Sequence, residues 1–281
     1  MDQIQLLDWP FVLIRGGGDL ASGVAIRLHR CGFAVGVAEL PQPLTVRRLV
    51  SFSETVHRGT HQIEEVTGIL AADVLEAVDI LQKHKVAVMI DPDCTALSSL
   101  NPLAVIDARM LKHDPGTTLV DKPMLIGLGP GFVAGVNCHA VIETNRGPHL
   151  GRVFWQGKAE EDTRLPEQVS GYRGERVLRS PADGILHAEA NLGQILDAGD
   201  LVATVAGKPV RAPFTGVLRG LVQDGLAVTL DMKIGDIDPR INPQLAVQVS
   251  DKALSIGGGV LEAMLSDPYI GASLGKTHAS G

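Results

Sequence analysis

Residues 11–23 read FVLIRGGGDLASG and decide the expected fold. Four apolar residues, typical of a buried strand, lead through Arg15 and three glycines into a segment whose apolar side chains recur at helical spacing as far as Cys31. Gly32 follows as a helix stop. The stretch therefore predicts a strand at 11–15, a glycine turn and a helix over 19–31.

The glycine turn also fits a ligand-binding motif. Gly16-x-Gly18-x-x-Ala21 matches a variant of the dinucleotide fingerprint, in which glycines let the backbone approach a pyrophosphate at the positive end of a helix. A second predicted strand, 34–40, carries Glu39, twenty-one residues after Gly18, where a carboxylate would accept the ribose hydroxyls. The pattern thus predicts a nucleotide-type ligand.

The alternative is a tight turn without a ligand. A carboxylate at the helix start competes with a phosphate for the same amides, and a neighbouring arginine would offset its charge. The candidate cofactor-binding residues of this first loop are Arg15, Gly16, Gly17, Gly18, Asp19 and Glu39.

Composition and charge narrow the class of protein. With 281 residues and 45% hydrophobic content, the chain can form one large domain and a smaller one. A formal charge of -7 without a basic block argues against nucleic-acid binding. No run of eighteen apolar residues occurs and Met1–Pro10 is acidic, so we expect no membrane association and a cytoplasmic location. Three cysteines without CxxC spacing fit reduced thiols, and only Cys94 stands in a turn where α/β proteins place their sites.

Short apolar runs alternate with helical patterns from residue 11 to about 145, which is typical of an α/β fold. We therefore predict a doubly wound, mostly parallel, Rossmann-like sheet. The predicted strands are 11–15, 34–40, 62–66, 86–90, 103–107, 124–128 and 138–143, and the clearest helix between them covers 71–84.

A second glycine loop follows the predicted strand at 124–128. Gly129 and Gly131 would open at the same sheet edge as the first loop, so one extended anionic ligand could contact both; the alternative is again a pair of tight turns. Asp107 and Arg109, just past another strand, would line the same site. Arg146, in the polar stretch after Thr144, suits phosphate or carboxylate binding, or is a solvated surface arginine.

An internal repeat follows the long polar stretch. Arg179-x-Pro181 recurs as Arg211-x-Pro213, each with the same glycine spacing after it, which predicts a folded-over β structure. The pattern resembles the barrel-sandwich hybrid of biotinyl and lipoyl carrier domains, but Lys208 at the junction lacks their flanking residues, so we expect no covalent biotin or lipoate. The expected domains are 1–175, Rossmann-like with a C-terminal loop region; 176–245, barrel-sandwich-hybrid-like; and 246–281, a helix packing back on the first domain and a flexible tail.

Several motifs together resemble the YqeB-type selenium-dependent molybdenum hydroxylase accessory proteins. They are RGGGDLASG at 15–23, IDARM at 106–110, GPGF at 129–132, IET at 142–144 and KIGDIDPR at 233–240. The resemblance spans nearly the whole chain. It implies bacterial maturation of molybdenum hydroxylases, an XdhC-like first domain, and the hydroxylase or its cofactor-maturation proteins as partners. One departure is Pro148, inserted before His149, which leaves in doubt any role carried over to that histidine.

The reaction, if any, stays open, because the sequence has no metal-ligand spacing, nucleophile motif or P-loop lysine. The leading hypothesis is an accessory protein that binds a nucleotide-like or molybdopterin-type cofactor, with NAD and molybdopterin cytosine dinucleotide as candidates. The alternatives are an NAD-dependent oxidoreductase, favoured by Glu39 alone, and a non-catalytic scaffold. A homo-oligomer is possible on any of these readings, and the roles of Cys94 and His149 are undecided.

Overall fold

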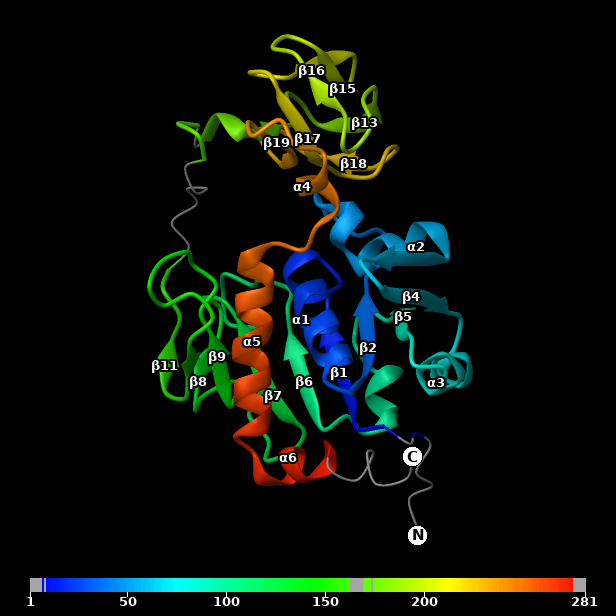
Figure 1. Ribbon diagram of the computed structural model, residues 1–281, viewed down its shortest axis with the longest axis vertical. Coiled ribbons are helices and arrows are strands. Elements are labelled where there is room, and N and C mark those ends of the chain that lie inside the picture. The colour runs from blue at the N-terminus through cyan, green and yellow to red at the C-terminus, as the bar shows by residue number, and fades with distance from the viewer. Residues whose placement is uncertain (1–6, 8, 162–168, 173, 275–281) are drawn as a thin grey trace.

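The computed structural model describes residue 7 and residues 9–161, 169–172 and 174–274. A nine-stranded sheet forms the centre of the larger domain, in the order β10-β9-β7-β6-β1-β2-β5-β4-β3 (Figure 1). Its strands are β1 (Phe11–Arg15), β2 (Ala34–Glu39), β3 (Thr60–Ile63), β4 (Val66–Ala71), β5 (Val86–Ile90), β6 (Ala104–Asp107), β7 (Met124–Leu128), β9 (Ala140–Ile142) and β10 (Val153–Phe154).

Helices cover both faces of this sheet. The helices α1 (Asp19–Arg30) and α5 (Asp251–Leu265) lie side by side on one face, and α6 (Pro268–Leu274) follows α5. The other face packs against α3 (Val74–Gln82) and the 3-10 turn η3 (Leu97–Leu100). The predicted helices at the first glycine turn and over 251–265 are confirmed. The clearest predicted helix, 71–84, is shorter and begins at an N-cap, Asp73, that accepts the Glu76 N–H.

Glycines allow α1 and α5 to pack closely. A Cβ added at Gly23 would lie 2.6 Å from the Ala253 Cβ, and one at Gly257 would lie 3.0 Å from the Gly23 carbonyl oxygen. Gly259 similarly meets the Gly151 backbone, whereas Gly258 faces open space. Since glycine is unfavourable inside a helix, the run of three in α5 is explained at two positions by backbone approaching from α1 and from residue 151.

The expectation of a Rossmann-like fold is wrong. Six of the eight strand pairings in the sheet are parallel, as expected, but β3 and β10 run antiparallel to their neighbours, so the sheet is mixed. The single strand predicted at 62–66 is instead a β3–β4 hairpin that turns at Glu64, whose φ is 52°. Residues 108–123, between β6 and β7, form no helix, and two short strands, β8 (Val133–Ala134) and β11 (Gly157–Lys158), pair outside the sheet.

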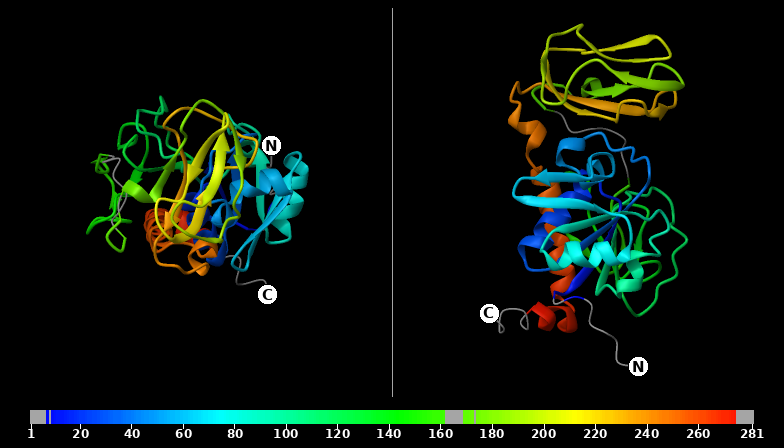
Figure 2. Two further views of the ribbon diagram at one scale, coloured as in Figure 1. Left: turned by 90° about the horizontal axis from the view of Figure 1, so that it is seen from above. Right: turned by 90° about the vertical axis from the view of Figure 1, so that its right-hand side faces the viewer.

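A β module, residues 177–238, lies beyond the carboxyl ends of the parallel strands (Figures 1 and 2). It consists of two four-stranded antiparallel sheets with their own apolar core. Its strands are β12 (Val177–Arg179), β13 (Gly184–Ala188), β14 (Ile195–Leu196), β15 (Leu201–Val205), β16 (Lys208–Arg211), β17 (Gly216–Leu221), β18 (Ala227–Val228) and β19 (Lys233–Asp238).

The module contacts the larger domain through residues 46–48 and through α4 (Gln244–Val247), which leads into α5. The Leu221 N–H donates to the Val46 carbonyl at 2.9 Å, and the Arg48 Nε donates to the Leu221 carbonyl at 2.8 Å. A Cβ at Gly220 would lie 2.6 Å from a Val46 methyl group. The residues that join the two bodies therefore lie just before and at the start of η1 (Arg48–Val50), which is followed by η2 (Phe52–Glu54) and α2 (Thr55–Arg58).

Among the described helices, none combines the length and the apolar composition that crossing a membrane would need.

Candidate functional site

The carboxyl edge of the parallel strands brings together Arg15, Asp107 and Arg109. Arg15 ends β1 and Asp107 ends β6, and the two are paired in register. The Asp107 carboxylate, 1% exposed, accepts hydrogen bonds from Arg109 Nε at 2.9 Å and Nη2 at 2.6 Å. Arg15 Nη1 lies 3.7 Å from the same carboxylate. One buried carboxylate thus lies between two guanidinium groups. The three side chains together carry one net positive charge.

The two arginines differ in how firmly they are held. The hydrogen bonds to Asp107 raise the pKa of Arg109 further above its usual value. Within the described part of the chain, the Arg15 guanidinium forms only the long contact to Asp107, and its side chain is 22% exposed. Arg15 is therefore the cation at this edge that can turn to an incoming anion.

Cys94 lies in the turn after β5, with a left-handed φ of 59°. Asp91 builds this turn, since its carboxylate accepts the N–H groups of Thr95 and Leu97 at 3.0 and 3.1 Å. Burial raises the pKa of the Cys94 thiol to about 11, and the nearby Arg15 charge opposes that shift. At neutral pH the group is a thiol, which is a poor nucleophile.

Glu39 is 7% exposed and bonds to the backbone of this chain. Its carboxylate accepts the Gly17 N–H at 2.6 Å and the Leu40 N–H at 2.7 Å. Burial raises its pKa, and these two hydrogen bonds oppose the shift. In the structure the carboxylate therefore anchors the first glycine loop, and its role toward a ribose stays a prediction.

The glycines of the first loop have different surroundings. Gly16 has φ +87°, and a Cβ there would lie 3.6 Å from the Ala108 carbonyl oxygen. A Cβ at Gly17 would lie 2.8 Å from the Ser53 nitrogen, whose N–H donates to the Gly17 carbonyl. A Cβ at Gly18, whose φ is -66°, would make an ordinary contact with the Thr45 hydroxyl at 3.9 Å. The closest backbone approach at this loop thus comes from residue 53 of the same chain.

The second loop is largely packed against the chain itself. Gly129, with φ +88°, lies beside Thr144 and Met110, which places it near the Asp107–Arg109 pair. A Cβ at Gly131 would lie 2.5 Å from the Leu111 carbonyl oxygen, so Gly131 serves a close backbone contact. The structure therefore brings one of these two glycines to the carboxyl edge.

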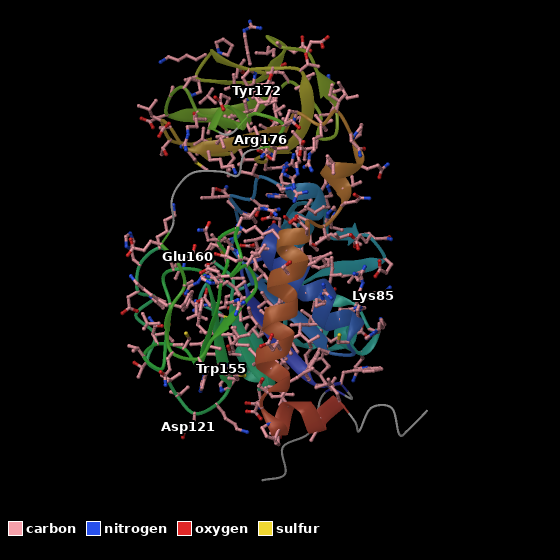
Figure 3. All side chains as sticks on the ribbon, turned by 60° about the vertical axis from the view of Figure 1, so that its left-hand side comes forward. Lys85, Asp121, Trp155, Glu160, Tyr172 and Arg176 are labelled. Carbon is pink, nitrogen blue, oxygen red and sulfur yellow. The ribbon has the colours of Figure 1, made fainter. Side chains whose placement is uncertain are left out.

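Arg146 lies elsewhere, at the start of α5. It donates two hydrogen bonds to Asp251, at 2.8 and 2.6 Å, and these lower the pKa of that carboxyl to about 2. Asp19 also turns away from Arg15, since its carboxylate lies 3.7 Å from Arg47 Nη1. His149 is half-exposed, with Nδ1 3.1 Å from Glu160 (labelled in Figure 3).

Sequence reasoning missed an ionic cluster on the module. Asp238, fully buried, and Asp236 accept long contacts from Arg176 and Arg219 at 3.6 to 3.8 Å. Figure 3 shows Arg176 on the side of the module that faces the larger domain. The KIGDIDPR motif, strand β19 and the residues after it, holds both aspartates, so the motif itself was the available signal.

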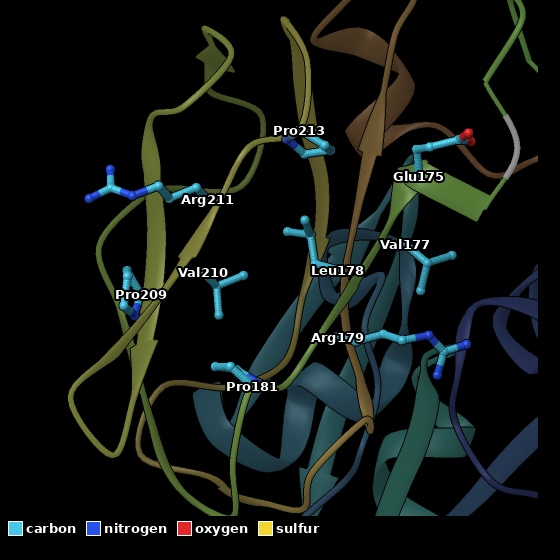
Figure 4. Close-up of a pocket in the computed structure, with 9 residues that line it drawn as sticks. All are labelled: Glu175, Val177, Leu178, Arg179, Pro181, Pro209, Val210, Arg211 and Pro213. Atoms are coloured by element: carbon cyan, nitrogen blue, oxygen red, sulfur yellow. The ribbon is translucent and has the colours of Figure 1, made fainter.

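A shallow groove of about 290 Å³ lies between the edge strands β12 and β16 of the module (Figure 4). Its walls come from equivalent positions of the internal repeat, with Arg179 and Pro181 on one side and Arg211 and Pro213 on the other. The groove therefore follows the pseudo-twofold symmetry of the module and lies apart from the carboxyl edge of the nine-stranded sheet.

The chain is 46% identical over 254 residues to the protein described as "Uncharacterized protein YqeB" from Escherichia coli (strain K12). The match covers 90% of this chain and 47% of that protein, so the chain spans about half the length of its relative. No family model matches the chain.

Solved structures resemble the chain only weakly. An aspartoacylase family protein from Mesorhizobium loti has 11% identity and a TM-score of 0.26, and a succinylglutamate desuccinylase from Silicibacter sp. has 15% identity and a TM-score of 0.24. Each comparison covers 82% of this chain and 85% of the other. The mixed sheet described above, with its antiparallel edge strands, is what departs from the Rossmann-like, XdhC-like, nucleotide-binding fold expected from sequence.

Proposed function

Because nine-tenths of the chain aligns with YqeB, the chain is a relative of that protein, and we propose that it is an accessory protein in the maturation of molybdenum hydroxylases. This is the role that its sequence motifs imply. The proposal further holds that the protein binds a molybdopterin-type anion at the carboxyl edge of the nine-stranded sheet.

The observation that carries the binding step is the Arg15–Asp107–Arg109 arrangement. Asp107 fixes Arg109 through two short hydrogen bonds, and among the described residues the Arg15 guanidinium has one polar contact, with Asp107 at 3.7 Å. Molybdopterin carries a phosphate monoester, and guanidinium groups bind phosphate oxygens through paired hydrogen bonds. A phosphate placed beside Arg15 and Arg109 would neutralise the net positive charge that these two arginines and Asp107 carry together.

The surroundings favour binding over covalent chemistry. The Cys94 thiol is buried and protonated at neutral pH, so it would contact a ligand without attacking it. The oxidoreductase alternative rested on Glu39, whose carboxylate accepts two backbone N–H groups of its own chain. No observation of the site favours that alternative.

The test is hydroxylase maturation in cells that depend on this protein. Arg15→Met keeps the length of the side chain and removes its charge, so we expect hydroxylase activity to fall at least tenfold. The matched control is Arg58→Met, which removes a half-exposed arginine while the buried Glu54 keeps its ion pair with Arg48 at 2.8 Å. Full activity with the Arg15 variant would contradict the proposal.

A further inference from the structure

Three aromatic side chains stack on one another at the amino edge of the parallel strands. The His84 ring stacks on both of the others, with its centroid 4.9 Å from that of Trp9 and 4.3 Å from that of His29. Trp9 comes two residues before the start of β1, whereas Arg15 is the last residue of that strand. The stack therefore lies at the opposite edge of the sheet from the proposed ligand site.

The stack joins helices from both faces of the sheet. His29 lies in the last turn of α1, and His84 follows α3 with a left-handed φ of 54°. The His29 Nε2 lies 3.0 Å from the His84 carbonyl oxygen. Since a carbonyl oxygen only accepts, this nitrogen must carry a hydrogen, and a proton added at Nδ1 would leave the hydrogen bond intact.

Trp9 links the stack to the apolar core beneath β1. Its partly buried ring packs against a cluster that includes Phe11 and Leu81. Leu7, which is buried, belongs to the same cluster. The chain that enters β1 is thus held by apolar packing and by the contact of Trp9 with His84.

The two imidazoles tolerate one proton better than two. A single positive charge meets an opposite one, since His29 interacts with the Glu65 carboxylate. A second proton would place two imidazolium rings with centroids 4.3 Å apart, beside the Lys85 ammonium. Like charges this close repel each other.

The other charged groups next to the stack form ion pairs of their own. These pairs add no free counter-charge for a second imidazolium. They are Arg30 with Glu64 and Glu65, at 2.6 and 2.5 Å, and Lys83 with Asp79, at 2.6 Å.

The pKa of His84 agrees with this geometry. Burial lowers that pKa below its ordinary value of 6.5, and the charges of His29 and Lys85 lower it further. Because the folded-state pKa is the lower one, the neutral ring contributes stability that is complete above pH 6.5 and is lost as the pH falls below it. Acid therefore weakens the stack.

We infer that the Trp9–His84–His29 stack is a pH-sensitive clasp, closed while the two imidazoles hold at most one proton and opened by the second. Opening separates Trp9 from His84 and frees the chain before β1. The strand itself stays in place, because its parallel pairings with β2 and β6 do not involve the stack. The clasp works independently of any ligand at Arg15.

The fluorescence of Trp9 in the full chain tests the clasp. The sequence has two tryptophans, so Trp155→Phe leaves Trp9 as the only one. Between about pH 8 and pH 5 we expect its emission maximum to move to longer wavelength, with a midpoint below pH 6.5, as the ring leaves the stack. The far-ultraviolet circular dichroism should stay constant over the same range.

Two variants in this background each remove one titrating ring. His29→Gln keeps an amide that can donate to the His84 carbonyl, and His84→Asn introduces a residue that tolerates a left-handed φ. Either should abolish the pH-dependent shift, since one proton does not open the clasp. His57→Gln, which removes an exposed histidine, is the matched control and should shift as the parent does.

Three results overturn the inference. They are an emission maximum that does not move between pH 8 and pH 5, a shift that persists in His29→Gln, and a loss of circular dichroism together with the shift. The last would mean that acid unfolds the whole chain. If His84→Asn fails to fold, His29→Gln decides the test.

Discussion

At the scale of single residues, the structure gives several predicted site residues a structural partner of their own. Glu39 is expected to meet a ribose, which stays a prediction; in the structure its carboxylate accepts the N–H groups of Gly17 and Leu40. Sequence spacing correctly placed Glu39 at the end of a strand beside the glycine loop. Spacing could not tell whether the carboxylate would meet a ligand or the amides of its own turn, because both geometries need an acid at the same place.

Cys94 yields a prediction about pH. Its pKa is raised from 9.0 to about 11 because burial disfavours the thiolate. The raised folded-state pKa means that the thiol contributes stability below pH 9, and that this contribution is lost as the pH rises through 11. In a variant with Cys31→Ser and Cys138→Ala, the thiolate absorbance at 240 nm should titrate near pH 11 when folded and near pH 9 in urea. A folded titration at 9 would show that the thiol is not buried in solution.

At the scale of elements, the sequence predicted individual strands and helices well and their connections poorly. The strands at 11–15, 86–90 and 124–128 are confirmed with the expected bounds. The hairpin at 60–71 was missed because its outer strand alternates exposed and buried residues and its turn uses Glu64 rather than glycine. The local pattern of apolar residues determines whether a segment forms a helix or a strand. The direction of a strand in the sheet depends on neighbouring strands that are distant in sequence.

The packing of α1 on α5 gives a prediction for two glycines. Gly23→Ala would force a methyl group to within 2.6 Å of the Ala253 Cβ, so we expect a loss of about 1–3 kcal/mol in the free energy of unfolding. Gly258→Ala meets open space inside a helix and should gain up to about 1 kcal/mol from helix propensity. Urea unfolding of the two variants measures these changes in the free energy of unfolding, which should have opposite signs. A Gly23 variant as stable as Gly258→Ala would contradict the packing described.

At the scale of the whole molecule, the sequence correctly predicted a mostly parallel sheet but wrongly made it Rossmann-like, since the nine-stranded sheet has antiparallel edge strands and a β module beyond its carboxyl edge. Alternating strands and helices indicate layers, but they do not reveal antiparallel edge strands or a helix-free connection at 108–123. The junction of the two bodies was also beyond sequence reasoning. Val46 and Leu221, which are hydrogen-bonded, are 175 residues apart, and nothing in either segment marks them as neighbours.

The central claim is that Arg15 and Arg109 bind a molybdopterin-type anion. The most direct test is the pterin released on denaturation from protein purified from cells that make molybdopterin, quantified by its fluorescence. We predict pterin in the wild type and in Arg58→Met, and at least a tenfold lower amount in Arg15→Met. Equal amounts in the wild type and the Arg15 variant, or none in the wild type, would contradict the claim.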